Sequence, residues 1–200
     1  MTTKKITLEH VTKVEGHAEV DISIKDGKVE HCHVHSTEGA RYFEGLIKGR
    51  KYDEVTMITS RICGICSCGH TIASITAVEN AFKLVPSKQT LLLRELITIG
   101  ERIRSHASHL YFFVLPDFVG YSSAIDMAKD FGPQVKDCLE IVSTGNELIK
   151  LLAGRDMHPF VPVVGGFTRI PGQDLFNEIK EKLKSIIPAV ERTIKLFASL

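Results

Sequence analysis

The spacing of hydrophobic residues changes its period near residue 36. Up to that point apolar and polar residues alternate, as in "HAEVDISI" and "KVEHCHVHS", which is typical of strands with one buried face. Asp26-Gly27 between these two segments favours a two-residue hairpin turn. The preceding "KITLEHVTKVEG" is expected to add a third strand. The sequence therefore predicts a small antiparallel sheet at the start of the chain.

From residue 39 the apolar spacing approaches the helical repeat of about 3.6 residues. A long helix is expected from Ser87, a suitable N-cap, to Pro116, and its apolar residues on several faces indicate that it is mostly buried. Shorter helices are expected in "ARYFEGLIKGR", "DEVTMITSR", "TIASITAVENAFKLV", "PQVKDCLEIVSTGNELIKLLAG" and the final segment from Asp174. The proline- and glycine-rich "HPFVPVVGGFTRIPG" is expected to be a connector.

These elements predict an α+β fold, with a small N-terminal antiparallel β-sheet followed by a mainly α-helical bundle around a long central helix. The β-rich portion is expected over 1–50 and the bundle over 51–200, together forming one continuous structural unit. The last segment still shows helical spacing at Leu200, without a glycine cap or polar tail. We therefore expect a chain that is incomplete at its C-terminus or that ends against a partner.

Composition excludes several classes of function. The 25 lysines and arginines nearly balance the 24 aspartates and glutamates, so no basic surface points to nucleic acid. No apolar run approaches the roughly 20 residues that span a bilayer, and the start of the chain does not resemble a signal peptide. The five cysteines are an odd number and three crowd together, which a disulfide framework would not explain. We expect a cytoplasmic protein with reduced thiols.

Candidate chemistry concentrates in "SRICGICSCGH", residues 60–70. The Cys63-x-x-Cys66 spacing brings two sulfurs to one side of a short turn, and Gly64 permits the backbone conformations that such a turn requires. Arg61 nearby would favour thiolate over thiol, or could hold the loop through bonds to its carbonyls. The residues alone leave open a zinc knot, a redox-active pair, an iron–sulfur cluster and half of a metal site; the zinc knot would use Cys63, Cys66, Cys68 and His70.

Three of these four interpretations meet physical objections, and the half site is the fourth. Four zinc ligands within eight residues would strain a tetrahedron, and no βαβ pattern surrounds the pair as a thioredoxin-like motif requires. Iron–sulfur clusters take four cysteines at other spacings. Soft thiolates select nickel, iron, copper(I) or zinc. Three histidines, His31, His33 and His35, also share one strand face, where a polar or interface surface is favoured over a metal site.

"RICGICSCGH" resembles the Arg-x-Cys-Gly-x-Cys-x-x-x-His signature of the large, catalytic subunit of nickel–iron hydrogenases. Further segments resemble that family in the same order, over about residues 9 to 200: "VTKVEGHAEVDI", "EGARYFEGLIKGR", "SHASHLYFFVLPDFVGYSS" and "HPFVPVVGG". The sequence of the third segment, "SHASHLYFFVLPDFVGYSS", is most similar to that of cytosolic, multi-subunit hydrogenases.

The resemblance implies a nickel–iron centre with cyanide and carbon monoxide ligands that catalyses reversible H2 oxidation and proton reduction. It assigns Cys63 to a terminal nickel ligand and Cys66 to a ligand that bridges nickel and iron. His70 would donate to the bridging sulfur, and Glu15 would relay protons from the terminal thiolate. Glu44 would bind Mg2+. Electrons would leave through iron–sulfur clusters in a small partner subunit, and further electron-carrier subunits are possible partners.

The sequence departs from the family in one respect. The family's second cysteine pair, near its C-terminus, is absent, and two thiolates cannot hold a nickel–iron centre. We therefore expect a C-terminal segment or a second chain to supply the remaining cysteines. Two alternatives stay open: a non-catalytic structural relative similar to the quinone-site subunit of complex I, and a zinc-stabilised interaction module. Cys32, Cys68 and Cys138 are expected to be packed or half-buried thiols without a metal.

Overall fold

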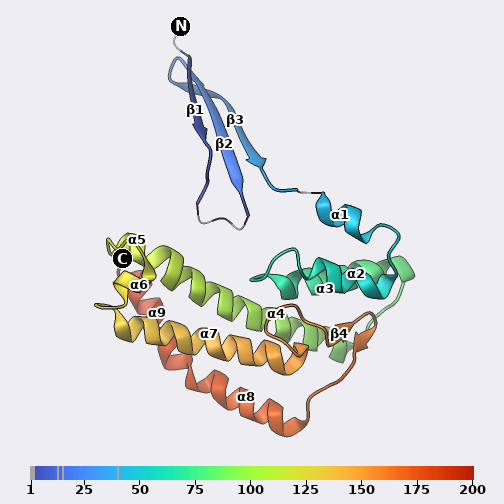
Figure 1. Ribbon diagram of the computed structural model, residues 1–200. Coiled ribbons are helices and arrows are strands. Elements are labelled where there is room, and N and C mark those ends of the chain that lie inside the picture. The colour runs from blue at the N-terminus through green and yellow to red at the C-terminus, as the bar shows by residue number, and fades with distance from the viewer. Residues whose placement is uncertain (1–2, 13, 15, 40) are drawn as a thin grey trace. The chain divides into compact units, whose positions relative to one another are not determined.

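The computed structural model describes residues 3–12, 14, 16–39 and 41–200, and its contacts divide the chain into two units, Met1–Lys48 and Gly49–Leu200 (Figure 1). The first contains a three-stranded antiparallel sheet, and the second is mostly helical. The predicted α+β class is confirmed. No helix within the described ranges combines the length and the apolar character that crossing a membrane would require.

The first unit is built on the predicted hairpin. Strands β2 (Ala18–Lys25) and β3 (Lys28–Ser36) pair in antiparallel register. The two turn residues, Asp26 and Gly27, have φ of 47° and 78°, the left-handed values that this tight turn needs. The third strand, β1 (Thr3–Leu8), pairs with β2 as expected, and the short helix α1 (Tyr42–Ile47) follows the sheet.

The two faces of this sheet differ in polarity. Thr7, Asp21 and His33 are in register on one face, and Thr7 Oγ1 donates to Asp21 Oδ1 at 2.6 Å. Ile6, Ile22 and Cys32 are in register on the other. Cys32 is exposed, which corrects the expectation of a packed or half-buried thiol. The reason is that β3 is an edge strand with every residue exposed.

The second unit is a bundle organised by two long antiparallel helices, α4 (Lys88–Ser108) and α7 (Gly132–Ala153) (Figure 1). Ser87 caps α4 as predicted, because its side chain accepts from the Thr90 N–H at 3.1 Å. The remaining elements are α2 (Tyr52–Thr59), α3 (Ser67–Phe82), the π-helix η1 (His109–Val114), α5 (Leu115–Phe118), α6 (Ala124–Met127), β4 (Pro162–Val163), β5 (Gly166–Phe167), α8 (Gln173–Ser185) and α9 (Ile187–Ala198).

Two glycines let α4 and α7 approach closely. A Cβ atom built on Gly100 would lie 3.2 Å from the Gly145 carbonyl oxygen and 2.9 Å from Ile149 Cγ1. One built on Gly145 would lie 2.9 Å from the Gly100 oxygen and 3.0 Å from the Arg104 nitrogen. Small residues at such a contact allow backbone-to-backbone packing. The crossing fixes where the C-terminal half of α4 lies relative to the rest of the bundle.

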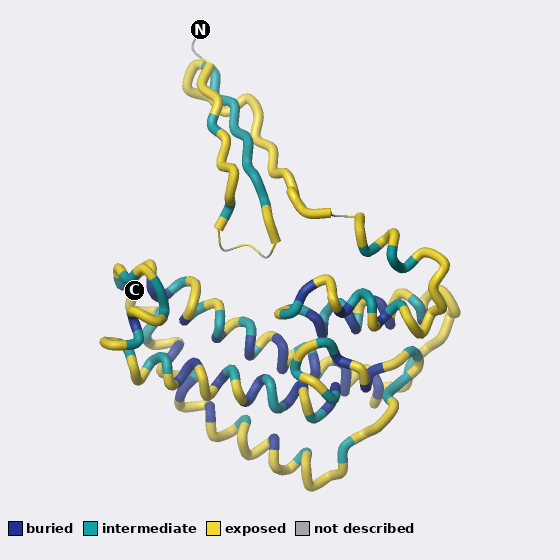
Figure 2. The backbone as a smooth tube through the Cα atoms, in the orientation of Figure 1, coloured by how far each residue is buried: buried dark blue, intermediate teal, exposed yellow. Residues whose placement is uncertain are grey.

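The hydrophobic core of the bundle has two clusters, which appear as the dark segments of α3, α4 and α7 in Figure 2. One joins residues of α3, α4, α7 and α8, including Cys68, Ile97 and Ile149. The other lies toward η1, α5 and α9 and includes Tyr111 and Cys138. The expectation that Cys68 and Cys138 are packed thiols is confirmed, since both are fully buried. Burial raises the pKa of Cys138 to about 11.

Three predicted elements differ in detail. The final segment, expected as one helix, is broken at Ile186 into α8 and α9, because Pro188 has no N–H and its ring blocks continuation of the preceding turn. The connector from residue 158 contains the small hairpin of β4 and β5. The long helix is expected to end at Pro116, but the helical run continues through η1 into α5. Pro116 lies in the first turn of α5, where no intrahelical N–H is needed.

Candidate metal centre

The two paired cysteines lie in the loop between α2 and α3. Cys63 is buried, and Cys66 is half-buried and forms the N-cap of α3. Their Cα atoms are 5.5 Å apart, and the two side chains are joined as a disulfide. The Cys66 N–H also donates to Cys63 Sγ at 3.2 Å. The two sulfurs therefore converge on one side of the turn as predicted, but they form a disulfide, which differs from the expected reduced thiols.

His70 completes a three-membered group one helical turn later. One ring nitrogen of His70 and the sulfurs of Cys63 and Cys66 all lie within 4.8 Å of one another. A backbone hydrogen bond explains this position. The His70 N–H donates to the Cys66 carbonyl at 3.2 Å, which places His70 one helical turn after Cys66 at the start of α3. Three soft or borderline donor atoms thus lie close enough together to bind one metal ion.

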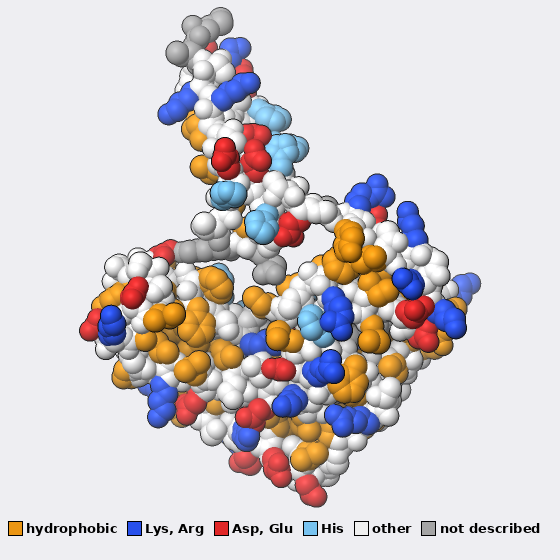
Figure 3. Space-filling model, in the orientation of Figure 1, with side chains coloured by type: hydrophobic (Ala, Val, Ile, Leu, Met, Phe, Trp, Pro, Cys, Tyr) orange, Lys and Arg blue, Asp and Glu red, His pale blue; other side chains and the backbone are white. Residues whose placement is uncertain are grey.

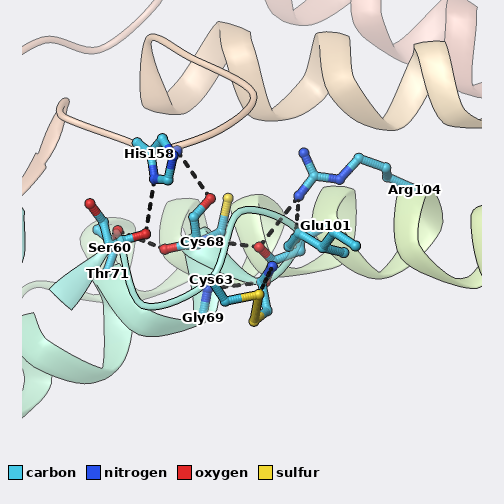
Figure 4. The surroundings of a disulfide bond; sticks show 11 residues. Ser60, Cys63, Cys68, Gly69, Thr71, Glu101, Arg104 and His158 are labelled. Atoms are coloured by element: carbon cyan, nitrogen blue, oxygen red, sulfur yellow. Dashed lines mark hydrogen bonds and ion pairs between the residues drawn. A yellow bond between two sulfur atoms is a disulfide. The ribbon is translucent and has the colours of Figure 1, made fainter. Parts of the chain in front are cut away.

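Glu101, on α4, caps the N-terminus of α3 (Figure 4). Its Oε1 accepts from the Cys68 N–H at 2.8 Å and its Oε2 from the Gly69 N–H at 3.0 Å. These are N–H groups of the first helical turn, which have no intrahelical acceptor. A carboxylate there also interacts favourably with the helix dipole. The residues that follow Cys66 are therefore fixed from a different helix.

Arg104 holds the middle of the loop from the same face of α4. Its Nη2 donates to the Ile65 carbonyl, between the two cysteines, at 2.6 Å, and its Nη1 donates to the Asp156 carbonyl at 2.7 Å. Arg104 also lies 3.5 Å from Glu101 Oε1. Both side chains are about nine-tenths buried. The pair satisfies the requirement that buried charges have partners.

His158 fixes the start of the loop from the connector after α7. Its Nδ1 donates to the Ser60 carbonyl at 2.9 Å, and its backbone N–H donates to Ser67 Oγ at 3.0 Å (Figure 4). The residue has a φ of 53°, a conformation that is unusual outside glycine. Loop residues 60 to 67 are thus held by side chains from two other segments of the second unit.

Cys68 does not take part in the convergent group. Its thiol is fully buried in the core cluster, and burial, reinforced by the Glu101 carboxylate, raises its pKa to about 12. Such a thiol is a poor metal ligand, because ligands bind as thiolates. Within the described ranges, the metal-competent group consists of Cys63, Cys66 and His70. The zinc knot with Cys68 as its fourth ligand is therefore not assembled.

The other predicted site residues are placed as follows. Arg61 is exposed and lines a hollow with Arg155 and His158. The loop carbonyl of Ile65 accepts its hydrogen bond from Arg104 and not from Arg61. Glu44, on α1, is exposed and accepts from Arg41 Nε at 2.9 Å. The predicted proton relay, Glu15, lies outside the described residues.

Histidines gather on the sheet of the first unit, where they are visible in pale blue in Figure 3. The rings of His31 and His33 are stacked with centroids 5.9 Å apart, and those of His33 and His35 are 4.2 Å apart. His35 Nε2 is also 3.0 Å from Asp21 Oδ2. These side chains are exposed and are not part of the metal-competent group. A solvated polar face accounts for them.

Sequence reasoning missed Glu101, Arg104 and His158. A signal for the first two was present: a long helix expected to be mostly buried carries two opposite charges at i and i+3, and buried charges need partners. The identity of those partners was not readable, because Glu101 is 33 residues from Cys68 in the chain and His158 is 98 residues from Ser60.

The donor set fits a soft transition metal. Two cysteine sulfurs and an imidazole favour nickel, iron, copper or zinc over magnesium or calcium. Binding requires both cysteines as thiolates, so the disulfide must first be reduced. Two thiolates and one histidine leave room for ligands from elsewhere.

Comparison with protein families gives two adjacent matches. Residues 41–137 match the family described as nickel-dependent hydrogenase, and residues 5–38 match the family described as HoxL-like. The chain is 36% identical over 195 residues to sulfhydrogenase 1 subunit alpha of Pyrococcus furiosus, covering 98% of this chain and 46% of that protein. It is 40% identical over 194 residues to sulfhydrogenase 2 subunit alpha of the same organism, covering 97% and 47%. The chain thus spans about half the length of these relatives.

Solved structures give the same fold. A crystal structure of an NAD+-reducing [NiFe]-hydrogenase in the H2-reduced state has a TM-score of 0.85 at 23% identity, covering 98% of this chain and 45% of that one. The Ni-Fe-Se hydrogenase from D. vulgaris Hildenborough in the as-isolated oxidized state has a TM-score of 0.77 at 26% identity, covering 96% and 43%. Both matches extend over the sheet and the helical bundle.

Proposed function

Because the chain belongs to the nickel-dependent hydrogenase family, as the N-terminal part of a large subunit, we propose that Cys63 and Cys66 supply two of the thiolates that hold a nickel–iron centre. The proposed activity of the assembled enzyme is reversible oxidation of H2. The observation that supports this most directly is the convergence of both cysteine sulfurs and a His70 nitrogen within 4.8 Å.

When bound, such a centre supplies an open coordination position for hydrogen and a store for electrons. Cys63 is the proposed terminal ligand and Cys66 the bridging one. The Cys66 N–H that donates to Cys63 Sγ would stabilise negative charge on that sulfur. His70, beside both sulfurs, is the proposed donor to the bridging thiolate, a contact that reduces its basicity.

Protons must leave the site through residues of the protein. We propose that the Cys63 thiolate accepts the proton and that the Glu15 carboxylate takes it onward, since a carboxyl group suits reversible proton transfer. Arg61, two residues before Cys63 and exposed, is proposed to add positive charge that favours the thiolate form of the loop.

The complete centre needs ligands from beyond these 200 residues. The sequence contains one Cys-x-x-Cys, so a further segment or a second polypeptide is proposed to supply the other two thiolates. The iron is proposed to carry cyanide and carbon monoxide. Electrons are proposed to leave through an iron–sulfur small subunit, and from there to further carrier subunits. The proposed location is cytoplasmic, where reducing conditions would keep these two cysteines as thiols.

Glu44 is proposed as a ligand to Mg2+. A carboxylate is a suitable ligand for this ion, which commonly takes one or two carboxylates and completes its shell with water. In the structure Glu44 is paired with Arg41, so ion binding would have to displace that exposed contact. An exposed ion pair is worth little, and its loss is therefore no obstacle.

The function is tested by nickel binding to the purified chain, reduced with a phosphine under anaerobic conditions. Ni2+ affinity is measured by competition with a chelator, together with the thiolate-to-nickel charge-transfer absorption. Cys63→Ser and Cys66→Ser should each weaken binding by at least about 100-fold, because even outer contacts to ligands are worth 10- to 100-fold.

The matched control is Cys32→Ser, which removes an exposed thiol on β3. It should leave the affinity and the absorption band unchanged. If Cys63→Ser binds nickel as tightly as the wild-type chain, the loop does not hold the metal and the proposal is wrong.

A further inference from the structure

We propose that Glu101 replaces the N-cap side chain of α3 and thereby frees the Cys66 sulfur to face Cys63 and His70. Glu101 would act as a positioning residue, with Arg104 as its support. The inference rests on the proposed function only for the statement that this sulfur binds a metal.

The argument starts from the position of Cys66 in the helix. Cys66 is the N-cap of α3, and an N-cap side chain normally accepts from the N–H two or three residues further on. Those residues are Cys68 and Gly69. A cysteine thiolate at a helix N-terminus is attracted by the same N–H groups. Without competition, the Cys66 sulfur would turn toward its own helix.

The structure shows that this position is already taken. The Cys68 and Gly69 N–H groups each donate to a different oxygen of Glu101, at 2.8 and 3.0 Å. Cys66 makes no side-chain capping bond, and its sulfur is joined to the Cys63 sulfur and lies near the His70 nitrogen instead. The capping requirement of α3 and the ligand requirement of the loop are met by different residues.

Arg104 keeps Glu101 in place. The guanidinium lies 3.5 Å from Glu101 Oε1, and both side chains are about nine-tenths buried. The same guanidinium donates to the Ile65 carbonyl. Arg104 therefore positions both the Glu101 carboxylate and the loop. Figure 4 shows both side chains reaching from α4 toward the loop that carries Cys63.

The test uses the thiol–disulfide equilibrium of Cys63 and Cys66 in glutathione buffers at fixed pH, with Ni2+ affinity as a second readout. In Glu101→Gln one N–H at the start of α3 loses its acceptor, so Cys66 in the reduced chain turns to cap it. The dithiol should then be favoured by about fivefold, the factor that a typical capping bond represents. Nickel affinity should fall, because the Cys66 sulfur then points away from the Cys63 sulfur and the His70 nitrogen.

Glu95→Gln, an exposed position on the same helix, is the matched control and should leave both readouts unchanged. Glu101→Asp keeps the charge but withdraws the acceptor, so it should shift the equilibrium in the same direction. A folded Glu101 variant with wild-type equilibrium and nickel affinity overturns the proposal. Failure of both variants to fold also overturns it, because Glu101 would then support the whole fold rather than direct one sulfur.

The two proposals fail in different ways. If nickel binding to the wild-type chain does not depend on Cys63 and Cys66, the proposed function is wrong, and the glutathione equilibrium still decides whether Glu101 directs the Cys66 sulfur. If nickel binds there and the equilibrium of Glu101→Gln is unchanged, the function stands and the positioning role is wrong.

Discussion

At the scale of single residues, the most buried ion pair lies apart from the metal-competent group. Arg94 donates to both oxygens of Glu79, at 2.8 and 2.6 Å, and to the Val163 carbonyl at 3.1 Å. Glu79 also accepts from the Gly165 N–H at 2.7 Å. Both charged side chains are less than 5% exposed. The pair joins α3 and α4 to the end of β4 and to the turn that follows it.

Removing one charge of this pair should be costly. Glu79→Gln leaves the Arg94 guanidinium buried without a counter-charge, and we expect the free energy of unfolding to fall by about 3–5 kcal/mol. Urea unfolding followed by circular dichroism measures this change. The exposed substitution Glu95→Gln should change the value by less than about 0.5 kcal/mol. An equally small change in Glu79→Gln would mean that the pair contributes no net stability.

The same pair predicts a pH dependence. Hydrogen bonds from Arg94 hold the pKa of Glu79 below its ordinary value of 4.5. Because the folded-state pKa is the lower one, the stabilisation is complete above pH 4.5 and is lost as pH falls through the folded-state value. The stability difference between wild type and Glu79→Gln should therefore be constant from pH 7 to 5 and narrow in more acidic solution. A difference that widens on acidification would contradict this assignment.

At the scale of elements, the crossing of α4 and α7 determines where Glu101 and Arg104 lie. Gly145 packs against the backbone of Gly100 and Arg104, so an added methyl group would have to push two helix backbones apart. A flexible side chain could move aside, but backbone atoms cannot do so cheaply.

Gly145→Ala should therefore destabilise the chain by about 1–3 kcal/mol, although alanine is the better helix former. Thermal and urea unfolding measure this effect. Gly132→Ala, at the exposed start of the same helix, meets no atom within 4 Å and should be neutral or slightly stabilising. If Gly145→Ala is as stable as Gly132→Ala, the helices are not held at this distance by the glycines.

Local patterns predicted most of the elements but not the supports of the loop. The Asp26-Gly27 turn, the Ser87 cap and the Cys63-x-x-Cys66 loop each depend on residues that are adjacent in sequence, so their patterns were readable. The roles of Glu101 and Arg104 depend on how α4 packs, which no local pattern encodes. The break at Ile186 had a local signal in Pro188. The prediction of one continuous helix followed the apolar spacing and did not use that signal.

At the scale of the whole molecule, the two units of the chain differ in how many of their residues are buried. Both core clusters belong to Gly49–Leu200, whereas the described residues of Met1–Lys48 include none classed as buried. In the first unit Leu8, Val29 and Val34 are at least half exposed. The apolar face of a sheet contributes to stability only when it is buried against another element.

We therefore expect residues 49–200 to fold on their own and residues 1–48 alone to form no cooperative fold. A chain of 49–200 should unfold cooperatively, with a free energy within about 1 kcal/mol of the full chain, since its core is intact. It should also retain nickel binding that is sensitive to Cys63→Ser. A peptide of 1–48 should show no cooperative transition. Loss of cooperativity in 49–200 would contradict this division.

The 5.5 Å separation of the Cys63 and Cys66 Cα atoms suits a covalent S–S link as well as a shared metal. If nickel binds there as proposed, oxidation to the disulfide and metal binding would compete for the same pair of sulfurs. Anaerobic biosynthesis, or a reductase acting before metal insertion, would keep the nascent site open for loading. A chain oxidised before it meets the metal should therefore bind nickel only after treatment with a dithiol reductant.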